Sequence, residues 1–350
     1  EVVVVDTQSS DQRAAMLTKK LIEQEKVQVI FGCWTSSCRK SVKPIIEKNS
    51  HLLFYPVQYE GLETSDSIVY LGSVPNQQLM PGTLWLERNF GSRILLIASD
   101  YVFPKVANKL IARQLTALKS KVAGEYYYPL GYNDFSHLPE LIKRHNVTAI
   151  INTLNGDSNH AFFDVVTSKH ISTPILSFSL SAQELKNLVI STHNNIYAAD
   201  SYFQTLSSDS NQEFKYRVFE RLGENTAISA PMVAAYNGVK LWAQAVERLK
   251  TYKPSSVRYG IQGETTSGPA GDVRISMLNN HVWTSFYVAK LKTDHIFEII
   301  NKINPPVRPL PFPSFGTKQA WYDYLDTLYH NWGNNWSSRK ASHPLNAGDE

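Results

Sequence analysis

The sequence predicts an α/β protein of two lobes, each built on a mainly parallel sheet flanked by helices. The chain has 350 residues, of which 43% are hydrophobic, so it can bury a full core and is long enough for more than one lobe. Short apolar runs alternate with amphipathic helical stretches along most of its length. This alternation is typical of parallel strands joined by helices that cover both faces of a sheet.

The first hundred residues are interpreted as the start of lobe one. Strands are expected where short apolar runs end at glycine or polar residues, and helices where apolar residues recur at helical spacing. The expected strands are 2–5, 27–31, 52–55, 68–71 and 94–98, and the expected helices are 12–25, 36–48 and 77–89.

The same alternation restarts after residue 100 and predicts lobe two. The expected strands are 121–128, 149–153, 175–177 and 196–202, and the expected helices are 104–118, 138–145 and 161–168. Helices at 211–222 and 231–249 and antiparallel strands at 273–277 and 282–291 follow. In the long helix, we expect one stripe to face the core: Met232, Ala235, Val239, Trp242, Val246 and Leu249.

The end of the chain predicts a tail that packs on the body. Five prolines between residues 305 and 313 indicate an extended strap. A short aromatic helix is expected at 319–330, with an apolar stripe that needs a partner surface. We assign residues 1–100 and 202–282 to lobe one, 101–201 and 283–305 to lobe two, and 306–350 to this tail.

Charge and motifs argue against several classes of function. The net charge of +4 comes from scattered Lys and Arg, which disfavours a nucleic-acid partner. No apolar stretch approaches the roughly 18 residues that a membrane span needs. The sequence has no Gly-x-Ser-x-Gly elbow, no Gly-rich dinucleotide or phosphate loop and no His-Glu-x-x-His pair. We therefore expect a binding protein without a cofactor, and not an enzyme.

Cys33 and Cys38 are the only cysteines of the chain. No second pair or suitably spaced histidines accompany them, so no metal site is expected. A disulfide stays open as an alternative, but tight loops often miss the required geometry. We expect two packed thiols beside a loop.

The residues that follow the expected strands point to the kind of ligand. Parallel sheets bind ligands at the carboxyl ends of their strands. Here those ends carry aromatic, hydroxyl and amide side chains and few histidines or paired carboxylates. Aromatic faces can sandwich an amide plane, and Ser36 and Ser37 stand where a helix cap could present free N–H groups to a carbonyl. Each such residue also has an ordinary explanation, as a core aromatic or a helix cap. Together they favour a neutral, planar, polar ligand.

Several short runs resemble one family. They are Phe-Gly-Cys-Trp-Thr-Ser at 31–36, Leu-Phe-Tyr-Pro-Val-Gln-Tyr-Glu-Gly at 53–61, Ser-Asp-Tyr-Val-Phe-Pro at 99–104 and Asn-Gly-Asp-Ser-Asn at 155–159. Jointly they resemble the urea-binding proteins of ABC importers and, more loosely, the amide-sensing regulators of amidase operons. The likeness covers residues 1–310 and implies a type I periplasmic-binding-protein fold, with two lobes hinged by three crossovers.

The resemblance also implies a ligand site. The matching positions here are Trp34, Ser36, Tyr55, Val57, Tyr101, Phe103 and Phe203, with Asp157 and Ser179 as weaker candidates. The amide sensors carry a Thr where this chain has Val57, so the preferred amide can differ.

Two departures from the family matter. The family opens with a strand and a Ser/Thr-Gly loop that this sequence lacks, so we expect lobe one to miss its first strand. The proline and aromatic tail is longer than in transport proteins and resembles tails of sensor domains that precede a membrane-bound kinase.

The resemblance implies binding of urea, acetamide or formamide by cleft closure in the bacterial periplasm. The ligand would then pass to an ABC permease, or its binding would be signalled through a fused histidine kinase.

Overall fold

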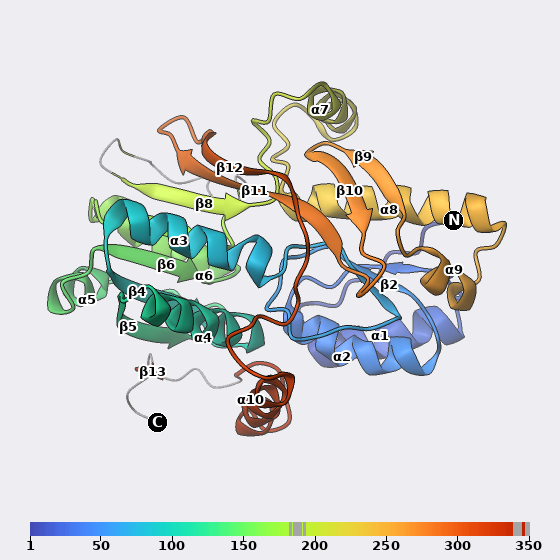
Figure 1. Cartoon of the computed structure of the whole chain (residues 1–350), viewed down its shortest axis with the longest axis horizontal. Helices are drawn as coiled ribbons and strands as arrows, with labels where there is room; N and C mark the ends of the chain where they lie inside the picture. The colour runs from blue at the N-terminus through green and yellow to red at the C-terminus, as the bar shows by residue number, and fades with distance from the viewer. Residues whose placement is uncertain (182–183, 185–190, 192–193, 339–344, 347–350) are drawn as a thin grey trace.

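The computed structural model describes residues 1–181, 184, 191, 194–338 and 345–346. Within them, the chain forms two α/β lobes that lie side by side, one around a small sheet and one around a large sheet (Figure 1). The expected two-lobed α/β fold is thereby confirmed.

The small sheet has three parallel strands in the order β1-β2-β3. They are β1 (Ile30–Phe31), β2 (Leu53–Tyr55) and β3 (Ile68–Tyr70). Neighbouring residues of a strand point to opposite faces. Leu53 therefore packs on the side of α1 (Asp11–Glu23) and α2 (Ser36–Lys48), and Phe54 packs on the side of α8 (Ala230–Leu249) and α9 (Pro254–Gly260).

The large sheet has the order β13-β5-β4-β6-β7-β8-β11-β10-β9, with β12 paired to β11. Its parallel part is β4 (Arg93–Ser99), β5 (Lys121–Tyr128), β6 (Ala149–Thr153), β7 (Ile175–Ser177) and β8 (Ile196–Asp200). Its antiparallel part is β9 (Thr265–Gly268), β10 (Gly271–Ile275), β11 (Val282–Leu291), β12 (Phe297–Val307) and β13 (Leu345–Asn346).

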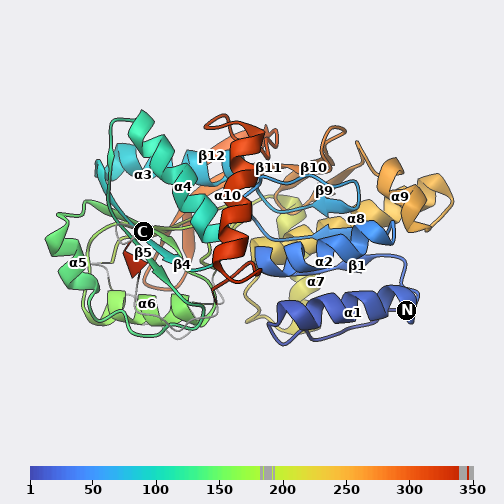
Figure 2. The same cartoon turned by 90° about the horizontal axis from the view of Figure 1, so that it is seen from below.

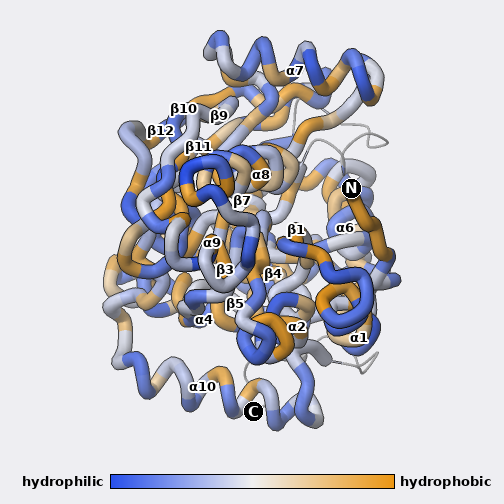
Figure 3. The backbone as a smooth tube through the Cα atoms, turned by 90° about the vertical axis from the view of Figure 1, so that its right-hand side faces the viewer, coloured by the Kyte–Doolittle hydropathy of each residue, from blue (hydrophilic) through white to orange (hydrophobic). Residues whose placement is uncertain are grey.

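Helices cover both faces of the parallel part. The short η1 (Pro75–Gln77) leads into α3 (Leu79–Phe90), which lies with α4 (Val102–Ala117) on one face. On the other face lie α5 (Leu138–Arg144) and α6 (Asp157–Ser168). A further helix, α7 (Asp209–Leu222), lies at the top of the molecule (Figures 1 and 3) and packs Phe214 against α8.

β11 is one of the connections between the lobes. Its first residues pair with β10 beside the small lobe, and Tyr287–Lys290 pair with β8 of the large lobe. Its pairing with β12 is irregular between Thr284 and Phe286, between these two stretches. The other connections follow β3 and β8, so three crossovers join the lobes.

Several elements differ from the expected ones. β4 pairs with β5 and β6 in the large sheet, whereas the expected division at residue 100 placed it in lobe one. Strands β9 and β12 and helix α9 were not expected from the sequence. Their residues include Gly, Pro and polar side chains, which carry no clear periodicity.

The expected strand at residues 2–5 is wrong. This run makes no strand, although Figure 3 shows it as hydrophobic, and all four valines are exposed. An apolar run becomes a strand only where a neighbour accepts its backbone hydrogen bonds. The pairs made by β1 lie with β2, not with this run.

The expected core stripe of α8 is also partly wrong. Met232 and Val239 are exposed, while Val233, Leu241 and Ala245 are buried. Trp242, Val246 and Leu249 of the expected stripe are partly buried and pack against the cluster that contains Leu241 and Ala245. The partner surface decides which stripe is buried.

The tail packs on the body as expected. Its helix α10 (Lys318–Asn331) buries Trp321, Leu325 and Leu328 in the core cluster that includes α4. Seen from below, α10 lies between α4 of the large lobe and α2 of the small lobe (Figure 2). The tail therefore lies at the lobe junction.

Candidate functional site

The loop from Cys33 to Cys38 is closed by a disulfide, with its two Cα atoms 5.6 Å apart. This separation lies within the usual range for disulfides, so the expectation of two packed thiols is wrong. The cap of α2 is Thr35, whose side chain accepts a hydrogen bond from the Cys38 N–H at 3.1 Å. Ser36 and Ser37 are therefore residues of the first helical turn and not the cap.

Four of the expected ligand residues come together at the lobe junction. The Tyr55 hydroxyl donates to the Trp34 carbonyl at 3.0 Å, and Ser36 lies beside Tyr55. Tyr101, the residue that caps α4, is buried near the same group. Tyr55 and Glu60 lie close enough for their charges to raise the pKa of Tyr101. Trp34 keeps 54% of its surface exposed. These residues thus present hydroxyl groups and one open aromatic face.

Burial keeps both tyrosines protonated. It raises the pKa of Tyr55 to about 12, although Arg39 partly opposes the shift. Burial also raises the pKa of Tyr101 well above its ordinary value. Both hydroxyls are therefore hydrogen-bond donors at neutral pH.

Behind these hydroxyls lie four charged side chains, Arg39, Lys40, Glu60 and Glu63, which we call the charge cluster. Arg39 donates to Glu60 Oε1 at 2.8 Å and to Glu63 Oε1 at 3.1 Å. Lys40 Nζ lies 3.2 Å from Glu63 Oε2. All four side chains are buried, and their two positive and two negative charges balance.

The charges of Arg39 and Glu63 are stabilised by their neighbours. Burial alone lowers the pKa of Arg39, but the carboxylates of Glu60 and Glu63 outweigh it and hold the pKa above its ordinary value. Burial alone raises the pKa of Glu63, but Arg39 and Lys40 outweigh it and hold the pKa well below its usual range. Ser36 links the cluster to the ligand loop, since its hydroxyl donates to Glu60 Oε2 at 2.5 Å.

A stack of aromatic rings packs against the charge cluster. The Arg39 guanidinium lies 4.2 Å from the ring centre of Tyr59, and Tyr70 stacks on both Tyr59 and His281. The His281 Nδ1 lies 2.6 Å from the Asn279 carbonyl oxygen, which can only accept a hydrogen bond. Nδ1 therefore carries the hydrogen, and Nε2 accepts from the Tyr59 hydroxyl.

Acid is expected to destabilise the protein through His281. Burial lowers its pKa to about 3, from an ordinary value of 6.5. As the pH falls below 6.5, the unfolded chain binds a proton that the folded chain refuses, so the free energy of unfolding falls. The loss is about 1–2 kcal/mol by pH 5. Unfolding in guanidinium chloride at pH 7.5 and 5.0 measures it.

The variant His281→Gln should lose less stability than the wild type between these two pH values. The matched control is the change of the exposed His170 to Asn. This variant should lose as much free energy of unfolding between pH 7.5 and 5.0 as the wild type. If all three proteins lose the same free energy of unfolding between the two pH values, His281 is not the cause of the loss.

Two further expected residues lie next to the group of ligand residues at the lobe junction, since the rings of Phe103 and Tyr101 are 6.3 Å apart and Val57 shares a hydrophobic cluster with Tyr55. Phe103 and Val57 are buried in the hydrophobic clusters of the large and small lobes. Asp157 is exposed at the first residue of α6. The Ser179 hydroxyl is buried and has no hydrogen-bond partner among the described residues. Next to it, Gln58 of the small lobe donates to the Phe178 carbonyl of the large lobe at 3.0 Å, which joins the lobes.

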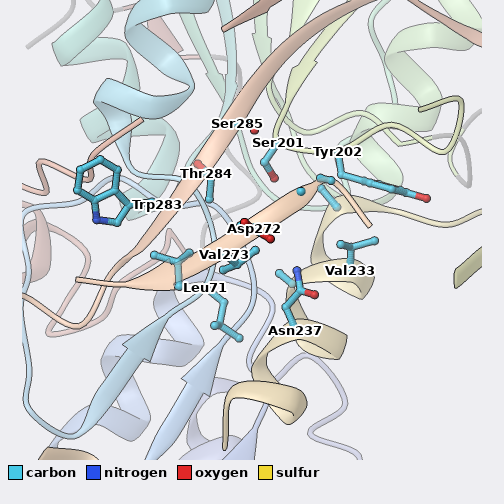
Figure 4. A pocket seen from close by; sticks show the side chains of 15 residues that line it. Leu71, Ser201, Tyr202, Val233, Asn237, Asp272, Val273, Trp283, Thr284 and Ser285 are labelled. Carbon is cyan, nitrogen blue, oxygen red and sulfur yellow. The ribbon is translucent and has the colours of Figure 1, made fainter. Parts of the chain in front are cut away.

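Phe203 lines a cavity of about 300 Å³ with Asp200, the last residue of β8. Burial raises the pKa of Asp200 to about 7. A second cavity, of about 30 Å³, is lined by all three crossovers, through Leu71, Ser201 and Ser285 (Figure 4). The second cavity has room for about one water molecule. Neither is lined by Trp34, Ser36, Tyr55 or Tyr101.

The charge cluster, the contact of Gln58 and the role of His281 were not predicted from the sequence. A signal existed, because Glu60 and Glu63 follow an expected strand end and Arg39 lies in a helix that starts at another. In the described part of the chain, no group of three His, Cys, Asp or Glu residues could hold a metal ion. None of the helices described has the length and apolarity of a membrane-spanning segment.

Comparison with known proteins gives one family. The family model of the periplasmic binding protein domain matches residues 1–318. The Leu/Ile/Val-binding protein homolog 6 of Brucella abortus (strain 2308) is 22% identical over 301 residues, 83% of this chain and 77% of that protein. A limonene hydroxylase of Geobacillus stearothermophilus is 25% identical over 138 residues, 38% of this chain and 25% of the hydroxylase. The chain therefore spans a minor part of that second relative.

Solved structures show the same fold. A solute-binding protein of an ABC transporter from R. palustris, in complex with 4-hydroxybenzoate, has a TM-score of 0.77 at 20% identity, over 86% of this chain and 85% of that one. A leucine-binding protein from Thermotoga maritima has a TM-score of 0.75 at 19% identity, over 87% and 88%. At such identities the likeness concerns the fold alone.

Proposed function

Because the chain belongs to the periplasmic binding protein domain family, we propose that it binds a small neutral amide between its lobes, with urea, acetamide and formamide as candidates. It is a solute-binding protein of the ABC-transporter type, and its family acts outside the cytoplasm. Binding energy is converted into closure of the two lobes, because a ligand that contacts both favours the closed state. The closed form would deliver the amide to an ABC permease.

The balanced charge cluster is the observation that carries the proposal of a neutral ligand. Relatives of the same fold bind 4-hydroxybenzoate or leucine, which carry a carboxylate. A buried carboxylate needs an unpaired cation or several hydrogen bonds. Here Arg39 and Lys40 are paired with Glu60 and Glu63, and Lys105 beside Tyr101 lies 3.8 Å from Asp100. These cations are already neutralised.

The remaining groups suit an amide. The Tyr101 hydroxyl can donate to its carbonyl, and the open face of Trp34 can stack on its plane. The Tyr55 hydroxyl donates its proton to the Trp34 carbonyl, so it can accept from an amide N–H. The buried Ser179 hydroxyl, which has no partner among the described residues, offers an acceptor for an amide N–H from the large lobe. Asp157 and Phe203 remain proposed contacts that would come into reach with further closure.

Isothermal calorimetry with five ligands tests the proposal. Urea, acetamide and formamide are compared with leucine and 4-hydroxybenzoate at pH 7.5. We expect binding of at least one amide and no heat from either carboxylate. Tighter binding of a carboxylate than of all three amides would overturn the assignment.

A second candidate output is sensing, as the ligand-binding region of a membrane histidine kinase. The observation that favours it is the position of the tail, which reaches Asp100 and Val102 on either side of Tyr101. In a sensor, ligand binding must change the C-terminal connection. Stimulation of the ATPase of a reconstituted cognate permease by the liganded protein would favour transport instead.

A further inference from the structure

The tail follows a route that touches both lobes. After β12, the Asn76 side chain bonds the backbone of Arg308 and Leu310, and the Leu62 N–H donates to the Pro311 carbonyl at 2.7 Å. The close approach at Pro311 requires Gly61, because a Cβ there would lie 2.4 Å from the Pro311 oxygen. The strap is thus held by specific contacts before α10 begins.

α10 then fastens the tail to α4. Its buried Trp321 lies 4.6 Å from the Arg113 guanidinium, and Lys109 of α4 lies 3.9 Å from the ring centre of Tyr324. Behind α10, the ring of Trp336 packs on Tyr329, with centres 4.7 Å apart. The helix therefore delivers Trp336 to a defined place.

That place is the backbone on either side of Tyr101. The first N–H groups of a helix have no partner inside it, and Tyr101 caps α4 without a side-chain hydrogen bond. The Val102 N–H instead donates to the Trp336 carbonyl at 3.1 Å, and the Ser338 N–H donates to the Asp100 carbonyl at 3.0 Å. The tail thus pairs with the segment that carries Tyr101 in the manner of a short antiparallel strand.

Trp336 also reaches the other lobe. Lys40 Nζ of α2 lies 4.7 Å from the centre of its ring, a cation–π contact. Lys40 belongs to the charge cluster, through its bond to Glu63. One residue of the tail is therefore bound to the Tyr101 segment on one lobe and to the charge cluster on the other.

We propose that Trp336 is a positioning residue for the ligand site: it fixes the segment that carries Tyr101 and ties this segment to Lys40 across the lobe junction. It acts through Tyr101, and we assign it no contact with the ligand. Its effect on affinity rests on the proposed function, whereas its effect on the Tyr101 segment does not. Displacing Trp336 frees Tyr101 and removes one connection between the lobes.

The test uses the full chain with Trp336→Ala, and Trp336→Phe as the conservative variant. The matched control is Tyr322→Ala, which removes a partly exposed aromatic ring of α10 that contacts Phe312. Backbone hydrogen exchange is followed at Val102 without ligand, and amide affinity is measured by calorimetry with urea and acetamide. Stability is measured by unfolding in guanidinium chloride, because urea is itself a candidate ligand.

We expect Val102 to exchange at least about tenfold faster in Trp336→Ala, since its acceptor is no longer held in place. Amide affinity should fall about three- to tenfold, the range of a lost cation–π contact. In Trp336→Phe, the exchange at Val102 and the amide affinity should be close to those of the wild type. Tyr322→Ala should change neither the exchange nor the affinity.

Unchanged exchange at Val102 in Trp336→Ala would overturn the proposal, whatever the ligand. So would a loss of affinity that Tyr322→Ala reproduces, or one that only follows a lower unfolding midpoint. If the wild type binds neither amide, the proposed function is in question, and the exchange at Val102 still decides the role of Trp336.

Discussion

Arg39→Ala is expected to lower the free energy of unfolding by about 3–5 kcal/mol. The guanidinium is fully buried and is the common partner of Glu60 and Glu63. Removing it leaves two carboxylates out of water with Lys40 as their remaining cation, and such uncompensated buried charge is costly. It also removes the contact that the guanidinium makes with the Tyr59 ring.

Unfolding in guanidinium chloride, followed by circular dichroism, measures the loss. The matched control is Arg144→Ala, because Arg144 pairs with Glu140 four residues away in α5 and both side chains are exposed. That variant should change stability by less than about 0.5 kcal/mol. Comparable losses in the two variants would show that the charge cluster contributes no more than a surface ion pair.

Tyr101→Ala and Trp34→Ala are each expected to weaken amide binding by more than about tenfold. Each removes an aromatic face or a donor that contributes about 1–3 kcal/mol when buried against a ligand. The two residues come from different lobes, so both losses together would place the ligand between the lobes. Calorimetry with the preferred amide measures the affinities, and circular dichroism confirms that the variants fold.

Tyr216→Ala is a suitable control, since Tyr216 is an exposed aromatic of α7. It should bind as the wild type does. Wild-type affinity in both Tyr101→Ala and Trp34→Ala would place the site elsewhere, with the Phe203 cavity as the next candidate.

The arrangement explains how charged residues can support a neutral site. Arg39 and its carboxylates do not face a ligand with free charge. They position hydroxyls, since Ser36 is bonded to Glu60 and to Arg39 at 3.1 Å. The ligand loop is further held by its disulfide, so the hydroxyl of Ser36 has little freedom. A preorganised polar group of this kind binds a ligand with little cost of reorganisation.

Some elements of the fold could be predicted from short stretches of the sequence. Strand and helix signals depend on neighbours within a few residues, so the strands 121–128, 149–153 and 175–177 were predicted with the bounds of β5, β6 and β7. Strands β9 and β12 escaped prediction, because they form by pairing with β10 and β11 and not by their own periodicity. The exposed run at residues 2–5 is the converse case, an apolar segment without a pairing partner.

The sequence by itself determined the α/β class, the two lobes, the packed aromatic tail and the polar character of the strand ends. It also pointed to Trp34, Ser36, Tyr55 and Tyr101, through the family resemblance of the short runs that follow expected strands. These are properties of short segments, and short segments set their own periodicity and their own termini.

Only the tertiary structure decided which of these residues meet and with what charge. Arg39 finds Glu60 and Glu63 across more than twenty residues of chain, and this pairing turns an apparently cationic loop into a neutral one. Trp336 reaches Tyr101 and Lys40 only because α10 is bound to α4. The physical reason is that burial and pairing depend on which surfaces pack together, and no local pattern contains that information.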